Sequence, residues 1–109
     1  MGFREDPKGF VRDQFKKLVV PGVKHVVTNE GFSGNKKYWL EVFESELKLT
    51  LNNGVSKSMT QFRCKEFELT RDNQKLGDQE FQKFGRKICE IANDLKIGKA
   101  KFQEIKLPR

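Results

Sequence analysis

The fold is decided by residues 38–51, which read Tyr-Trp-Leu-Glu-Val-Phe-Glu-Ser-Glu-Leu-Lys-Leu-Thr-Leu. Apolar residues recur at every second position in both halves of this stretch: Tyr38, Leu40 and Val42, then Leu47, Leu49 and Leu51. This period of two is typical of strands with one buried face. The stretch is too long for a single strand, since most have about 3–10 residues. We therefore expect a turn, bend or bulge near residues 44–46.

A second strand is expected to follow the turn signal at residues 52–54, which read Asn-Asn-Gly. A three-residue loop would set Leu51 opposite Val55 and Leu47 opposite Met59. That register places apolar residues opposite apolar residues and leaves Gly54 free to adopt a positive φ. We therefore predict it in preference to a two-residue loop.

Further strands are expected on both sides of this hairpin. Residues 23–28 are rich in valine, which favours extended structure. The apolar residues change from even to odd positions between Cys64 and Phe67, so they would no longer lie on the same face of one regular strand. This indicates either a bulge or two strands. In the basic tail, residues 97–109, the apolar side chains suggest a short final strand or a docked segment: Phe102, Ile105 and Leu107.

Two segments show helical periodicity. Residues 7–19 begin at Pro7, after the possible cap Asp6, and their spacing places one mostly apolar set on a single helical face: Phe10, Val11, Gln14, Phe15, Leu18 and Val19. Residues 78–96 carry the clearest stripe, with Asp78 as the expected cap: Phe81, Phe84, Ile88, Ile91, Ala92 and Leu95. The predicted fold is a single α+β domain over residues 1–109, with an antiparallel sheet of about four to five strands, within residues 23–71, packed on an N-terminal and a C-terminal amphipathic helix.

The sequence argues against catalysis. His25 is the only histidine and lies in a predicted strand, so a His-based triad would depend on it. With Cys64 and Cys89, this histidine makes at most three possible zinc ligands, whereas a structural zinc site typically needs four. Nucleotide-binding glycine motifs are absent from the sequence. We therefore expect a non-enzymatic protein without a metal or cofactor; an enzyme with an unfamiliar site is the least favoured class.

Positive charge suggests what the protein binds. The chain has 22 Lys and Arg against 15 Asp and Glu, a formal net charge of +7. Basic and aromatic residues occur together near the predicted sheet, as in proteins that bind phosphates and stack bases. We predict a nucleic-acid-binding domain for single-stranded or irregular RNA or DNA, with these contact residues: Phe32, Lys36, Lys37, Trp39, Arg63 and Lys65.

The alternative is a protein-interaction or assembly module that dimerises or docks through an apolar sheet face and the C-terminal tail. The two cysteines are expected to be free thiols in an intracellular protein, either cytoplasmic or nuclear. No apolar run is long enough to cross a bilayer, so we expect no membrane partner.

Two resemblances bear on the nucleic-acid hypothesis. Residues 31–34, Gly-Phe-Ser-Gly, are similar to the Gly-x-x-Gly loop with which KH domains grip a nucleic-acid backbone. That loop joins two helices in KH domains, whereas strand-like segments flank it here. The order of elements, a sheet followed by a helix, also resembles the positive-cofactor and Whirly families of single-stranded DNA-binding proteins. Only the order of elements carries this second resemblance, so it assigns no residue a role.

Overall fold

The computed structural model describes residues 9, 11–13, 16, 19–29, 36–53, 58–66 and 68–108. These residues form seven strands and one long helix. In chain order the elements are β1 (Val23–Asn29), β2 (Tyr38–Phe43), β3 (Glu46–Asn53), β4 (Ser58–Lys65), β5 (Glu68–Arg71), β6 (Gln74–Lys75), α2 (Asp78–Lys96) and β7 (Ala100–Lys106).

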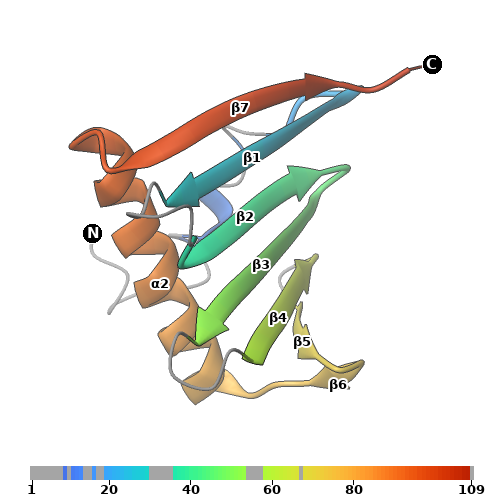
Figure 1. The fold of residues 1–109 in the computed structure, drawn as a ribbon. Helices are drawn as coiled ribbons and strands as arrows, with labels where there is room; N and C mark the ends of the chain where they lie inside the picture. The colour runs from blue at the N-terminus through green and yellow to red at the C-terminus, as the bar shows by residue number, and fades with distance from the viewer. Residues whose placement is uncertain are drawn as a thin grey trace.

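The seven strands form one antiparallel sheet in the order β6-β5-β4-β3-β2-β1-β7. Strands β1 to β6 follow one another as a meander, in which each strand pairs with the next. Helix α2 then runs back across the sheet and returns the chain to β1, where β7 adds as the last strand (Figure 1). Gly98 has a φ of 80° in the turn between α2 and β7, a conformation that glycine adopts without a steric penalty.

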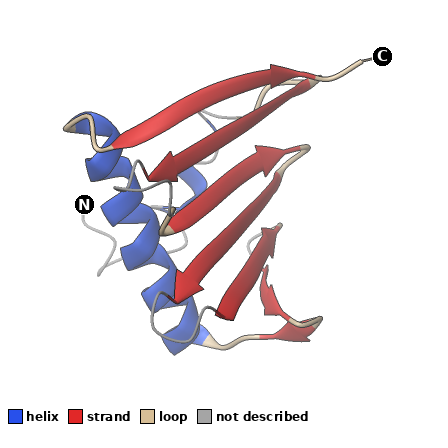
Figure 2. Ribbon diagram, in the orientation of Figure 1, coloured by secondary structure: helices blue, strands red, loops and turns tan. Residues whose placement is uncertain are grey.

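The core lies between one face of the sheet and α2 (Figure 2). The alternating apolar residues of β2 and β3 point to this side, which we call the helix face. Phe84 of α2 contacts both Phe62 of β4 and Phe81, with ring centroids 6.4 and 6.0 Å apart. Thirteen core residues are buried: Val11, Val27, Tyr38, Leu40, Val42, Leu47, Leu49, Cys64, Leu69, Phe81, Phe84, Ile88 and Ile91.

Helix α2 has the bounds expected from its apolar stripe. Asp78 is its first residue rather than its cap, because Gly77 occupies the cap position without a side-chain hydrogen bond. Near the N-terminus, residues 9, 11–13 and 16 are helical, and Val11 is fully buried in the core. The rest of the predicted helix at residues 7–19 lies outside the described residues, apart from Val19. Among the described residues, no helix has the length and apolar character needed to cross a membrane.

The predicted fold class is wrong in its number of strands and in its two flanking helices. The sheet has seven strands instead of four to five, and the described residues contain one helix of seven residues or more. β6 was missed because it has only two residues, both polar, which carry no periodic signal. β7 lies in the tail, where its pairing with β1 is a contact between distant parts of the sequence. Both additions extend the edges of the predicted sheet.

The strand registers decide between the alternatives left open near residues 44–46 and after Cys64, and they test the predicted hairpin at residues 52–54. Phe43 pairs with Glu46 and Lys65 pairs with Glu68, so two-residue turns separate β2 from β3 and β4 from β5. The expected register after residues 52–54 is wrong, because Leu51 pairs with Thr60 instead of Val55. The observed register aligns the buried side chains of β3 and β4 on the helix face, with Leu47 opposite Cys64 and Leu49 opposite Phe62. Burial of these pairs outweighs the loop length that the turn signal suggested.

The turn between β2 and β3 stores local strain. Glu44 and Ser45 have φ values of 51° and 63°, a conformation that most residues with a side chain avoid. Both positions of such a two-residue hairpin favour Asn and Gly. Asp72 and Asn73, between β5 and β6, have φ values of 53° and 64°, but their residue types tolerate this region better.

We therefore expect the double substitution Glu44→Asn with Ser45→Gly to raise the free energy of unfolding by about 1 kcal/mol. Urea denaturation monitored by circular dichroism would measure the gain. The matched change Asp72→Asn with Asn73→Gly should gain less, because the native Asp and Asn already suit a positive φ. An equal gain at both turns would contradict this explanation.

Tyr38 brings a polar hydroxyl group into the core. Its side chain is 3% exposed, and its hydroxyl donates a 2.7 Å hydrogen bond to Asp94 Oδ2 on α2. This bond ties β2 to the last turns of the helix. Burial, together with the hydrogen bond to Asp94, raises the pKa of Tyr38 well above its ordinary value.

This raised pKa predicts a pH dependence of stability. Above about pH 10 the unfolded chain releases the Tyr38 proton while the folded chain retains it, so the free energy of unfolding falls as pH rises. Tyr38→Phe should cost about 1 kcal/mol at neutral pH by removing the hydrogen bond. Because the chain has one tyrosine, the variant should also show a shallower loss of stability between pH 9 and 11 than the native chain, as measured by urea denaturation. Parallel curves would refute the role given to this hydroxyl.

Candidate nucleic-acid interface

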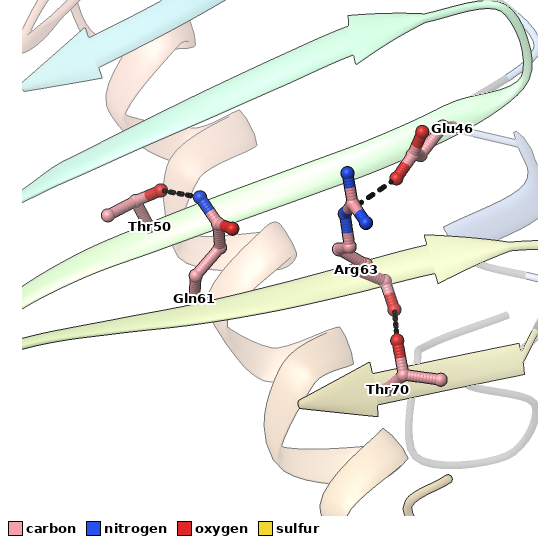
Figure 3. Close-up of polar contacts among 5 residues, drawn as sticks. All are labelled: Glu46, Thr50, Gln61, Arg63 and Thr70. Atoms are coloured by element: carbon pink, nitrogen blue, oxygen red, sulfur yellow. Dashed lines mark hydrogen bonds and ion pairs between the residues drawn. The ribbon is translucent and has the colours of Figure 1, made fainter. Parts of the chain in front are cut away.

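The sheet face opposite α2 carries the polar side chains of the alternating strands, and we call it the open face. Figure 3 shows Glu46, Thr50, Gln61 and Arg63 on this side, with α2 behind the sheet. Gln61 Nε2 donates to Thr50 Oγ1 at 3.2 Å, and the Thr70 hydroxyl donates to the Arg63 carbonyl at 3.5 Å. Helix α2 leaves this side to the strands, because its buried residues belong to the core on the helix face.

Trp39 lies on the open face as the second residue of β2. It pairs with Thr50 of β3 on one side and with Thr28 of β1 on the other. The burial pattern of β2 alternates, with Tyr38, Leu40 and Val42 buried and Trp39 half-buried. Of its two threonine neighbours, Thr28 is 4% exposed and Thr50 is half-buried.

Basic residues outnumber acidic ones on the open face. Strand parity places six basic side chains on this side: Lys24, Lys48, Arg63, Lys65, Lys75 and Lys101. The acidic residues at equivalent positions are Glu41, Glu46 and Glu68. The excess is therefore positive, although the two signs are interspersed.

Ion pairs neutralise part of this charge. Lys24 Nζ lies 2.6 Å from Glu41, and Arg63 Nε lies 3.0 Å from Glu46. The Arg63 side chain is 50% exposed, so its remaining guanidinium nitrogens are accessible to a ligand. Such partly exposed pairs contribute little to stability, which means that a phosphate can compete for Arg63 at small cost.

The six residues predicted to contact nucleic acid do not form one compact cluster. Arg63 and Lys65 share the open face with Trp39, but β4 is two strand spacings away from β2, about 10 Å. Lys37 is exposed just before β2, and its carbonyl accepts a 2.9 Å hydrogen bond from the Asn52 amide. Lys36 is half-buried, and its carbonyl accepts from Asn52 Nδ2 at 3.3 Å. Phe32, with the whole Gly-x-x-Gly loop at residues 31–34, lies outside the described residues.

Sequence reasoning missed two lysines of the open face, Lys48 and Lys101. Lys48 pairs with both Glu41 and Arg63, so it stands between the β2 and β4 parts of the face. Lys101 of β7 pairs with Thr28, which itself pairs with Trp39. The alternation of Lys48 with the leucines of β3 was a usable signal for its face. The position of Lys101 required the pairing of β1 with β7, for which the sequence has no local signal.

A shallow polar pocket of about 210 Å³ extends the open face toward the β5–β6 turn. It is lined by Gln61, Arg63, Thr70, Asp72 and Asn73. Its amides, hydroxyl, guanidinium and carboxylate offer both hydrogen-bond donors and acceptors. The pocket therefore suits a polar planar group better than an apolar one.

His25 lies on the helix face, away from this surface. It is 3% exposed and stacks on Phe102, with ring centroids 5.2 Å apart. Its Nε2 is 3.5 Å from Glu104 Oε1, while Nδ1 has no hydrogen-bond partner in the described part of the chain. Across the described ranges, no three His, Cys, Asp or Glu side chains lie together as a metal ion would require.

Comparisons with protein-family models, with curated proteins and with solved structures found no match to this chain.

We expect that charged residues of the open face can be changed without unfolding the protein. Lys48→Gln and Arg63→Gln should each alter the free energy of unfolding by less than about 1 kcal/mol, because Lys48 is half-buried at the surface and the partly exposed Arg63–Glu46 ion pair is weak. Urea denaturation of the two variants tests this. A loss above about 2 kcal/mol in either would mean that the charges of this face support the fold, contrary to this expectation.

Proposed function

We propose that the protein is a non-enzymatic nucleic-acid-binding domain that holds single-stranded or irregular RNA or DNA on the open face. The observation that carries the proposal is the half-buried Trp39 on a sheet face where basic residues outnumber acidic ones. An indole on an open sheet offers a stacking surface that accepts any base, and lysines around it offer charge to the phosphates.

Electrostatics favour a polyanionic ligand. The formal net charge of +7 attracts nucleic acid at long range, and each phosphate contact releases counterions. On the open face, Lys48 lies beside the Arg63–Glu46 pair, and Lys101 lies one strand beyond Thr28. We therefore extend the contact surface proposed from the sequence, Phe32, Lys36, Lys37, Trp39, Arg63 and Lys65, by Lys48 and Lys101.

A path for the strand follows from the sheet geometry. The row from Gln61 through Thr50, Trp39 and Thr28 to Lys101 crosses five strands and spans about 20 Å. A single strand lying along this row would stack one base on Trp39 and place another near the polar pocket beside Gln61. Single-stranded nucleic acid fits this arrangement because its bases are free to stack.

The cysteines are compatible with the expected location. Cys64 is buried in the core and Cys89 is half-buried on α2, and the two cysteines do not form a disulfide. Free thiols are the rule in reducing compartments. We propose an intracellular location, cytoplasmic or nuclear.

The test is binding of fluorescein-labelled oligothymidylate and oligouridylate of 20 nucleotides, measured by anisotropy at low and moderate salt. The native chain should bind at low salt and lose affinity steeply as salt rises. Trp39→Leu should weaken binding roughly tenfold, as expected for the loss of one stacked base. Lys48→Gln should reduce the slope of log affinity against log salt by about one contact.

A matched control separates the open face from general charge. Lys83 and Lys87 of α2 lie on the other side of the molecule, where they pair with Glu80 and Glu90. Lys83→Gln with Lys87→Gln should therefore affect binding less than the same change at Lys48 and Lys101. No binding by the native chain at low salt, or equal losses in both pairs, would refute the proposal.

A further inference from the structure

The outer edge of β7 is a free pairing edge. β7 is the last of the seven strands, and its only strand neighbour is β1 among the described residues (Figures 1 and 2). It has seven residues, while β6 at the opposite edge has two. Long exposed edges accept further strands, so β7 is the one edge of this sheet with room for a partner.

The alternation of hydrogen bonds between β7 and β1 identifies which backbone amides and carbonyls of β7 point away from the sheet. The Leu107 amide donates to the Gly22 carbonyl at 2.9 Å, next to the register that pairs Val23 with Lys106. In an antiparallel ladder, hydrogen-bonded and non-hydrogen-bonded pairs alternate. Residues 101, 103 and 105 therefore bond to β1. The amides and carbonyls directed away from the sheet belong to Ala100, Phe102, Glu104 and Lys106.

Two apolar side chains stand beside these outward groups, one on each face. Phe102 lies on the helix face against His25, and Ile105 lies on the open face opposite Lys24. Each is 41% exposed, and every residue from 101 to 106 is exposed. An added strand would cover both side chains while it satisfied the free backbone groups.

The positive charge along β7 indicates what kind of strand could bind at this edge. Lys99, Lys101 and Lys106 surround the edge, with Glu104 as the only acid between them. A second copy of the chain would bring these lysines together, and edge lysines are a recognised defence against self-pairing. We propose that β7 binds an extended acidic segment of a partner protein, which adds to the sheet as an eighth strand.

A designed peptide tests this directly. In antiparallel register, the capped peptide Glu-Val-Thr-Thr-Val-Glu-Thr-Glu sets glutamates opposite Lys106, Lys101 and Lys99. It sets valines opposite Ile105 and Phe102. Anisotropy of the labelled peptide should show saturable binding to the full chain. The same peptide with lysine in place of each glutamate should bind at least tenfold more weakly.

Paired variants test the backbone contribution. Glu104→Pro removes one outward amide without breaking a bond to β1, since proline is tolerated at edge positions of this kind. Glu104→Gln keeps the amide and removes the same negative charge. We expect at least a tenfold loss of peptide affinity in the proline variant and equal or tighter binding in the glutamine variant. Circular dichroism checks that both are folded.

A second measurement covers the case in which the proline variant does not fold. Methylating the peptide nitrogens that face β7 should abolish binding to the native chain, whereas methylating the alternate nitrogens should not. Equal effects of the two methylations, or equal binding of a scrambled peptide, would overturn the proposal. So would a dimer in light scattering that Glu104→Pro dissolves, because the edge would then pair with a second copy.

Discussion

Burial of one face of β2 and β3 under α2 is the constraint on which the rest of the structure depends. Because side chains alternate along a strand, fixing Leu40, Leu47 and Leu49 in the core also fixes Trp39, Lys48 and Thr50 on the other side. A shift of one residue in either strand would exchange the two sets and expose the leucines. The same apolar burial that holds the domain together therefore determines which polar groups a ligand meets. Fold and surface chemistry are linked through strand parity alone.

The parts of the fold that could be predicted are those with a local period. The alternation at residues 38–51 indicated extended structure with a turn, bend or bulge near residues 44–46, where the structure has the turn between β2 and β3. The stripe at residues 78–96 indicated α2 with its observed bounds. β6 has too few residues for a period, and β7 owes its place to β1, far away in the sequence. The same difference applies to the site. The alternation of side chains along a strand placed Trp39 on the opposite face from Tyr38, but the neighbours of Trp39 on adjacent strands depend on the strand register. The expected three-residue loop would have set Lys48 opposite Ser58, whereas the sheet sets it opposite Arg63.

The open face combines a positive excess with ion pairs that are easily broken. Glu46 holds Arg63 and Glu41 holds Lys24, both at partly exposed positions. Such pairs keep the lysines and arginines ordered and reduce repulsion within a chain of high net charge. They also leave cations that can exchange a carboxylate for a phosphate. Under the proposed function, the affinity of this surface for nucleic acid should depend on ionic strength.

The pairing of β1 with β7 determines where the molecule is expected to open first. The meander of β1 to β6 joins neighbours through short connections, so each closure costs little chain entropy. The contact between β1 and β7 instead joins the beginning of the sheet to the end of the chain. Its closure carries the largest entropy cost in the sheet, and its strand buries little apolar area in return. β7 is therefore the unit that we expect to detach first in local unfolding, while the six-stranded remainder stays folded.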